Sequence, residues 1–169
     1  MINILTRNIL RFAILVIAQA LFFNNIQFSS LGVNPFIYIL FIILLPFETP
    51  KSLLLIIAFL LGLSVDLFSD TFGMHAAATV FMAYMRPMIL SSIAPRDGYE
   101  TGAFPRVFYF GFNWFFKYSL FLVLSHHFFY YFLEAFTFSD FFSSLFKIFI
   151  STILSVFLVI LSQYLVYKK

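Results

Sequence analysis

The chain has 169 residues, of which 63% are hydrophobic, 22% aromatic and 10% charged, and its mean hydropathy is +1.02. A soluble domain carries about 25% charged residues, whereas a helix that crosses a ~30 Å hydrocarbon core needs roughly 20 apolar ones. The net charge of +3 comes from scattered basic residues, which disfavours nucleic-acid binding, and the absence of cysteine excludes disulfides and thiolate sites. The composition therefore predicts an all-α integral membrane protein with one membrane domain over residues 1–169.

Six apolar runs follow one another along the chain, and we expect each of them to be a transmembrane helix. Their bounds are 9–28, 33–47, 52–68, 72–94, 107–133 and 142–166. The second and third runs are short for spans, at ~22 and ~26 Å by helical rise. A re-entrant pair is the alternative, but it would carry Glu48 and Lys51 into the bilayer at a cost of several kcal/mol. The pattern favours a polytopic fold with six spans joined by short loops.

Lysine and arginine predict the orientation, because loops retained in the cytoplasm carry the excess of positive charge. With the N-terminus inside, the cytoplasmic side receives Arg7, Arg11, Lys51, Arg96, Arg106, Lys168 and Lys169. The outer ends of the spans carry Asp66, Asp70, Glu134 and Asp140, with Lys147 as the basic residue on that side. We therefore expect both termini to lie in the cytoplasm.

Two aspartates and a histidine surround the turn after the third run: Asp66, Asp70 and His75. Carboxylate and imidazole groups are suitable ligands for a divalent cation. The spacing crosses a turn, however, and no fourth ligand is in evidence. The alternative is that Ser69 or Asp70 caps the helix of the fourth run, where an acid also complements the helix dipole. We favour this structural role and predict neither a metal nor a cofactor.

Arg86 lies inside the fourth run and is followed directly by Pro87. The proline removes the hydrogen bond to the carbonyl of Ala83 and is expected to kink the helix. Arg86 can satisfy that carbonyl, reach Glu48, snorkel to the inner headgroups, or dock a partner helix. We favour snorkelling or satisfaction within the chain, with partner docking as the alternative.

The fourth run also carries small residues at helical spacing, namely Ala76, Thr79 and Ala83. Small side chains let helices approach closely in lipid, where packing replaces the hydrophobic driving force. This face therefore predicts a helix–helix contact, either within the chain or with a partner.

The fifth run is rich in aromatic residues and would be ~40 Å long if wholly helical, so its ends must project or the helix must tilt. We expect Lys117 to snorkel to the inner interface with cation–π contacts, beside Trp114 as an interface anchor. His126 and His127 are adjacent and point to different faces, which disfavours a shared metal. We expect them to belong to an aromatic belt at the outer interface.

Catalytic motifs are absent from the sequence. It contains no HExxH motif, no glycine-rich phosphate loop and no serine–histidine–acid set with helix-compatible spacing. We therefore expect a protein that is not an enzyme.

Four phrases stand out within this layout: Asn34–Tyr38 (NPFIY), Leu45–Pro50 (LPFETP), Ala58–Phe68 (AFLLGLSVDLF) and Gly73–Thr79 (GMHAAAT). Together they resemble the bacterial rod shape-determining protein MreD family. The resemblance is densest from 34 to 106, and it includes Tyr84–Pro87 (YMRP). Its more specific element is a glycine four residues before an aspartate, followed by glycine and histidine at the start of the next helix.

The resemblance implies a non-enzymatic subunit of the cell-wall elongation machinery, located in the bacterial cytoplasmic membrane and needed for cell shape. Its implied partners are a bitopic MreC-type protein and, through it, the polymerase RodA, a penicillin-binding transpeptidase and MreB filaments. The candidate residues for helix packing or partner contact are Gly62, Asp66, Gly73, His75, Ala76, Thr79, Ala83, Arg86 and Pro87.

The family fold is similar to the six-helix substrate-binding components of vitamin importers, so a small-molecule uptake subunit is the alternative function. Such a subunit needs a polar-lined cavity that opens outward. The outer loops are short and the chain has few hydrogen-bonding groups to bury, which favours the scaffold.

Overall fold

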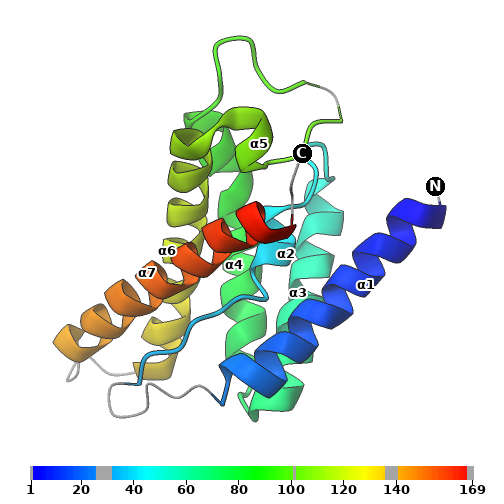
Figure 1. Cartoon of the computed structure of the whole chain (residues 1–169). Helices are drawn as coiled ribbons and strands as arrows, with labels where there is room; N and C mark the ends of the chain where they lie inside the picture. Colours follow the sequence, from blue (N-terminus) through cyan, green and yellow to red (C-terminus); the bar gives the residue numbers. More distant parts are fainter. Residues whose placement is uncertain (1, 26–31, 101, 136–140, 167–169) are drawn as a thin grey trace.

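The computed structural model describes residues 2–25, 32–100, 102–135 and 141–166, and this part of the chain is helical and contains no strand. Helix α1 (Ile2–Ala18) continues into the π-helical turn η1 (Gln19–Phe23). The remaining elements are α2 (Leu40–Ile43), α3 (Lys51–Ser69), α4 (Met74–Ser92), α5 (Val107–Phe110), α6 (Phe112–Ala135) and α7 (Phe141–Val166) (Figure 1).

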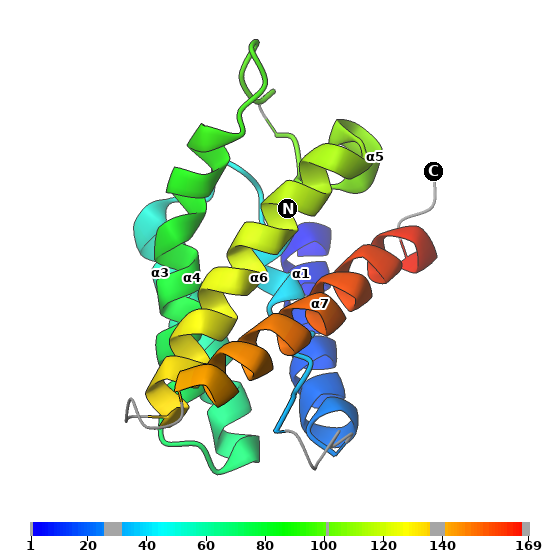
Figure 2. The ribbon, with the colours of Figure 1, turned by 90° about the vertical axis from the view of Figure 1, so that its left-hand side faces the viewer.

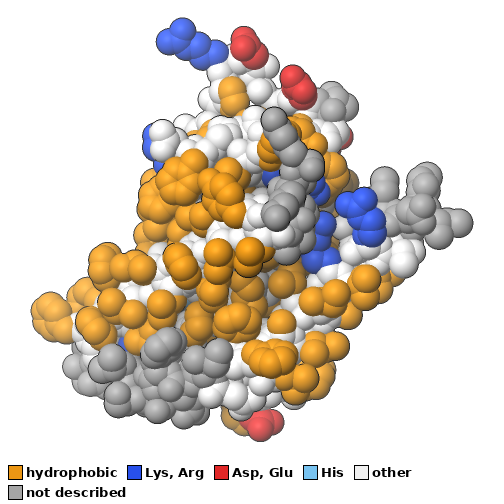
Figure 3. All heavy atoms as spheres, in the orientation of Figure 1, with side chains coloured by type: hydrophobic (Ala, Val, Ile, Leu, Met, Phe, Trp, Pro, Cys, Tyr) orange, Lys and Arg blue, Asp and Glu red, His pale blue; other side chains and the backbone are white. Residues whose placement is uncertain are grey.

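Three stretches of helix are long and apolar enough to cross a membrane: Thr6–Phe23, Lys51–Ser69 and Phe141–Leu165. Hydrophobic side chains cover much of the middle of the molecule in Figure 3, whereas most of the visible charged side chains lie toward the top of the view. Exposed apolar surface of this extent marks a contact with lipid or with other proteins. These features indicate a membrane protein.

Helices α4 and α6 are also long, at ~28 and ~36 Å for their 19 and 24 residues. Helix α3 packs against α4, α4 against α6, and α6 against α7, which crosses α6 diagonally (Figures 1 and 2). The turn between α3 and α4 lies at the end of the bundle opposite the 93–106 loop. Lys168, Lys169 and Asp140, used above to orient the chain, lie outside the described residues.

The expected second span, 33–47, is not a continuous helix. Within it, only Leu40–Ile43 form a helix, yet residues 35–45 are all buried. Pro35 and Pro46 bracket this stretch and interrupt helical hydrogen bonding at both ends. We call residues 33–46 the core segment. Most of its side chains are apolar and pack among the surrounding helices, so the prediction of a helical span was wrong here.

The expected fifth helix, 107–133, is broken at Gly111. This residue has φ +78° and ψ 167°, a conformation that glycine adopts readily because it has no Cβ. The short helix α5 therefore ends there, and α6 starts in a new direction at Phe112.

Helices α3 and α4 approach closely at Gly62. A Cβ at this position would lie 2.4 Å from the Cα of Ala76 and 2.5 Å from the carbonyl oxygen of His75. These are backbone atoms, so the helices would have to separate. The contact explains why a glycine stands here and shows that Ala76 packs within the chain.

Gly62→Ala is therefore expected to lower the free energy of unfolding by about 1–3 kcal/mol through overpacking. The measurement is an equilibrium unfolding titration in mixed dodecyl maltoside–SDS micelles, followed by circular dichroism. Ser64→Ala, a half-buried position on the same helix, is the control and should leave the midpoint unchanged. Equal midpoints for the two variants would contradict the close approach.

Candidate functional site

The core segment has backbone groups that no regular helix satisfies, and side chains from surrounding helices bind them. The N–H of Phe36 donates to Ser155 Oγ at 2.9 Å, and the N–H of Ile37 donates to Gln19 Oε1 at 2.8 Å. All four residues are buried. Lipid offers no hydrogen bonds, so irregular backbone at membrane depth requires such partners. The polar residues of the apolar helices thus hold the core segment in place.

Arg86 binds the other end of the core segment. Its side chain is 1% exposed, and its Nη2 donates to the carbonyls of Leu45 and Pro46, the latter at 3.3 Å. Its Nε donates to Tyr118 Oη at 2.8 Å, and that hydroxyl donates to the carbonyl of Ile43 at 3.0 Å. A planar guanidinium with five N–H groups suits several carbonyls at once. Arg86 and Tyr118 therefore join α4 and α6 to the core segment.

This arrangement differs from several of the roles considered for Arg86. The side chain is too buried to snorkel, and Glu48 instead accepts a hydrogen bond from the N–H of Gly102 at 3.3 Å. In the described part of the chain, Arg86 makes no hydrogen bond to the carbonyl of Ala83. Its donors serve the chain itself, which leaves none of the guanidinium on the surface for a partner helix.

Asp66 holds the start of α4 from the neighbouring helix. Its side chain is buried, and its two carboxylate oxygens accept hydrogen bonds from the N–H groups of His75 at 3.0 Å and Ala76 at 2.9 Å. Thr71 Oγ1 donates a third bond to Asp66 at 2.6 Å. The first N–H groups of a helix have no partner within it, and a carboxylate also complements the helix dipole. Asp66 therefore fixes how α3 and α4 meet.

The expected capping by Ser69 or Asp70 is wrong. Ser69 Oγ donates to the carbonyl of Val65 at 2.9 Å, and Asp70 is exposed with φ +51°. The cap position of α4 is Gly73, with φ +82° and no side-chain capping bond. Left-handed residues at both ends of the turn bring α4 back alongside α3, so the acid that reaches its N-terminus comes from the preceding helix.

Tyr38 of the core segment lies at the centre of a buried polar cluster. Its Oη is 3.1 Å from His75 Nδ1, 3.2 Å from Thr79 Oγ1 and 2.6 Å from His126 Nε2. All four side chains are at most 2% exposed. Tyr38 was not among the predicted site residues, although a polar residue within an apolar run was the signal that could have found it.

His126 and His127 do not form an aromatic belt, because both are 0% exposed. They do point to different sides of α6, as expected for adjacent helical residues. His126 faces Tyr38, whereas His127 Nε2 lies 3.1 Å from Ser155 Oγ on α7. Both sides are covered by other elements, so the two rings are core residues.

The carboxylates and the imidazole considered as metal ligands do not converge on one point. Asp66 binds backbone N–H groups, His75 faces Tyr38, and Asp70 is exposed on the turn. Across the described ranges, no group of three histidine, aspartate or glutamate side chains is placed to hold a metal ion.

The remaining predicted site residues lie in different surroundings. Thr79 and Ala83 are buried within the chain, so the small-residue face packs internally. Trp114 is half-buried and donates through Nε1 to the carbonyl of Ile93 at 3.0 Å, which ties α6 to the end of α4. Lys117 is exposed, and among the described residues it has no cation–π contact.

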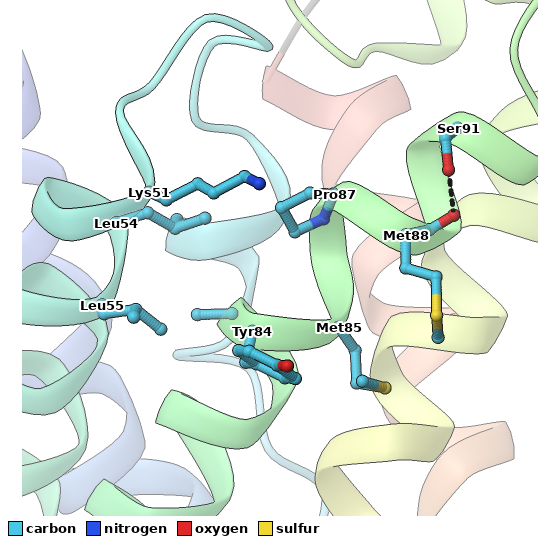
Figure 4. Close-up of a pocket in the computed structure, with 9 residues that line it drawn as sticks. Lys51, Leu54, Leu55, Tyr84, Met85, Pro87, Met88 and Ser91 are labelled. Carbon is cyan, nitrogen blue, oxygen red and sulfur yellow. Dashed lines mark hydrogen bonds between the residues drawn. The ribbon is translucent and has the colours of Figure 1, made fainter.

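A groove of about 440 Å³ runs between α3 and α4 on the surface (Figure 4). Leu54 and Leu55 of α3 face Tyr84 and Pro87 of α4 across it, and Lys51 extends over one end. The groove therefore lies beside Pro87 while Arg86 points into the core.

A polar pocket of about 350 Å³ lies at the opposite end of these helices, at the α3–α4 turn. Its lining includes Asn34, Asp70, His75 and Tyr130. This pocket and the Tyr38 cluster show that the chain buries many hydrogen-bonding groups, so the prediction of few such groups was wrong.

The arrangement can hold helices and an irregular segment in fixed positions. Its surface also offers the apolar groove between α3 and α4, a second apolar groove of about 600 Å³ whose lining includes Phe12, Phe41 and Leu53, and the polar pocket at the α3–α4 turn. No protein-family model, curated protein or solved structure matches the chain.

Proposed function

We propose that the chain is a non-enzymatic scaffold subunit of the bacterial cell-wall elongation complex. In this proposal it lies in the cytoplasmic membrane with both termini inside and crosses the membrane six times, through α1, the core segment, α3, α4, α6 and α7. It maintains cell shape by binding the single transmembrane helix of an MreC-type protein, which connects it to RodA, a penicillin-binding transpeptidase and MreB. The sequence phrases described above support this assignment.

The observation that carries the proposal is the groove between α3 and α4. It is lined mainly by apolar side chains and lies beside the Tyr84–Pro87 phrase. Tyr84 and Met88 are 66% and 59% exposed, so they present apolar surface that a partner helix can cover. Arg86, next to Pro87, is already bound within the chain, and Lys51 is the charged side chain in the lining of the groove. Packing against apolar side chains is therefore the main interaction open to a partner.

Copurification tests the proposal directly. The tagged chain is expressed with the MreC-type protein of the same organism, extracted in mild detergent and analysed for stoichiometric capture. Depletion of the chain in cells is expected to turn rods into spheres. Normal rod shape together with absence of the MreC-type protein from the purified sample would overturn the proposal.

Tyr84→Ala is expected to reduce captured MreC-type protein about fivefold, a loss of about 1 kcal/mol of binding free energy, because it removes an aromatic surface from the groove. The measurement is the ratio of the two proteins after affinity purification. Tyr164→Ala removes a tyrosine that is 56% exposed on α7, and it serves as the matched control. Equal capture by both variants would show that the partner binds elsewhere.

A second candidate function is a small-molecule uptake subunit of a membrane transporter. The observation that favours it is the polar pocket at the α3–α4 turn, which adjoins His75 of the buried cluster. A stoichiometric small molecule in the purified protein, with no MreC-type partner, would favour uptake over the scaffold.

A further inference from the structure

The polar pocket at the α3–α4 turn has the size of a small-molecule site. Its volume of about 350 Å³ lies within the range of small-molecule sites. The core segment, α3, α4 and α6 contribute Phe36, Phe68, His75 and Tyr130 respectively. We propose that this pocket binds a small, flat, uncharged polar molecule that carries a carbonyl or ring-nitrogen hydrogen-bond acceptor.

Two buried groups in the pocket lack a hydrogen-bond partner. Tyr130 is 4% exposed, and its Oη makes no hydrogen bond within the described part of the chain. His75 is 2% exposed, and while its Nδ1 lies 3.1 Å from Tyr38 Oη, its Nε2 has no partner among the described residues. Neither atom is among the fully enclosed polar atoms without a partner, so both are open to the pocket, where a bound molecule can form hydrogen bonds with them.

The hydrogen bonds around His75 determine whether its free nitrogen, Nε2, is a donor or an acceptor. Thr79 Oγ1 donates to the carbonyl of His75 at 2.7 Å, so its proton is not available to Tyr38. His126 Nδ1 is buried without a partner, and an orphaned N–H is rarer in proteins than an orphaned acceptor. Neutral His126 therefore carries its proton on Nε2 and donates it to Tyr38 Oη, at 2.6 Å.

The Tyr38 hydroxyl has one proton and two acceptors within reach, His75 Nδ1 at 3.1 Å and Thr79 Oγ1 at 3.2 Å, and we assign the proton to the nearer one, His75 Nδ1. A neutral His75 that accepts at Nδ1 has its proton on Nε2, which is the free nitrogen at the pocket. The pocket thus offers a donor at His75 and a hydroxyl at Tyr130. This is why the ligand must carry an acceptor.

The charge and shape of the pocket narrow the ligand further. Asp70 is the acidic residue in its lining, and neither lysine nor arginine lines the described pocket, which disfavours an anion. The rings of His75 and Tyr130 lie 4.6 Å apart between centroids, and Phe36 and Tyr130 lie 4.8 Å apart. Aromatic walls of this kind favour a flat ring that packs against them.

Saturation-transfer NMR on the full chain in lipid nanodiscs tests the inference, with nicotinamide and uracil as probes. Both are flat, uncharged and carry carbonyl acceptors, and both are expected to receive saturation from the protein. Nicotinate has the same ring as nicotinamide but a negative charge, and its signal is expected to be about fivefold weaker, as for a loss of about 1 kcal/mol. Simple fragments bind their sites with dissociation constants in the millimolar range, so a probe concentration of about 10 mM would detect them. Absence of saturation transfer to both uncharged probes at this concentration would overturn the inference.

Tyr130→Phe is the matching variant, because it removes only a hydroxyl that has no partner in the described chain. Its unfolding midpoint is expected to equal that of the unsubstituted protein, while probe affinity falls about fivefold, the contribution of one net hydrogen bond. Tyr164→Phe, on the exposed side of α7, is the control and should bind as before. Equal probe binding by Tyr130→Phe would overturn the inference. This outcome is separate from the scaffold proposal, which is decided by capture of the MreC-type protein.

Discussion

Arg86→Met is expected to lower the free energy of unfolding by about 2–4 kcal/mol. The substitution leaves the carbonyl of Leu45 without a donor and removes the Nε bond to Tyr118. Each lost bond of this kind costs about 1–3 kcal/mol. Two effects limit the total: Thr49 still donates to the carbonyl of Pro46, at 2.7 Å through Oγ1, and the cost of burying the guanidinium disappears.

Unfolding in mixed dodecyl maltoside–SDS micelles measures this loss. The unfolding free energy of Arg86→Lys is expected to lie between those of Arg86→Met and the unsubstituted protein. An ammonium group cannot bind the carbonyls and Tyr118 at once, because it lacks the planar set of donors of a guanidinium. Lys117→Met removes an exposed cation and is the matched control, with an unchanged midpoint. If Arg86→Met were as stable as the unsubstituted protein, the core segment would not depend on the guanidinium.

Asp66→Asn is expected to cost about 2–4 kcal/mol, although the chain should still insert into the membrane. Hydrogen bonds to a charged acceptor contribute about 1.5–3 kcal/mol each, and Asp66 accepts two from backbone N–H groups of α4. An amide keeps one acceptor oxygen but directs its own N–H₂ at the other backbone donor. The start of α4 should therefore loosen against α3.

Asp70→Asn provides the comparison for this second variant. Asp70 is exposed at φ +51°, and asparagine tolerates the left-handed region as well as aspartate does. Its unfolding midpoint should not change. Equal midpoints for Asp66→Asn and Asp70→Asn, together with unchanged partner capture and cell shape, would reduce Asp66 to an ordinary turn residue.

The long helices were predictable from the sequence because a helix satisfies its own backbone. Apolar composition and run length then suffice to place it in lipid, as for Lys51–Ser69 and Phe141–Val166. The same reasoning failed for the core segment. Hydropathy measures how apolar a run is, but it does not distinguish a run that faces lipid from one that other helices enclose.

For individual site residues, too, the sequence predicted one part and left another undetermined. Gly62, Asp66 and Arg86 stood out by type, because a charge or a missing side chain within an apolar run needs a physical reason. Their partners did not: Asp66 was expected near a turn, Arg86 either at the membrane surface or satisfied within the chain, and the two adjacent histidines in an aromatic belt. All of these side chains are buried, and Arg86 and His126 bind residues of the core segment, which is distant in the chain.

The sequence by itself therefore determined that this is a helical membrane protein with a few polar groups that must be satisfied inside it. Only the tertiary structure decided which groups satisfy them, since Arg86 binds carbonyls some 40 positions away and Phe36 binds Ser155 across 119. A backbone group in lipid must find a partner, but which one it finds depends on the neighbouring helices, and that is a property of packing and not of local sequence.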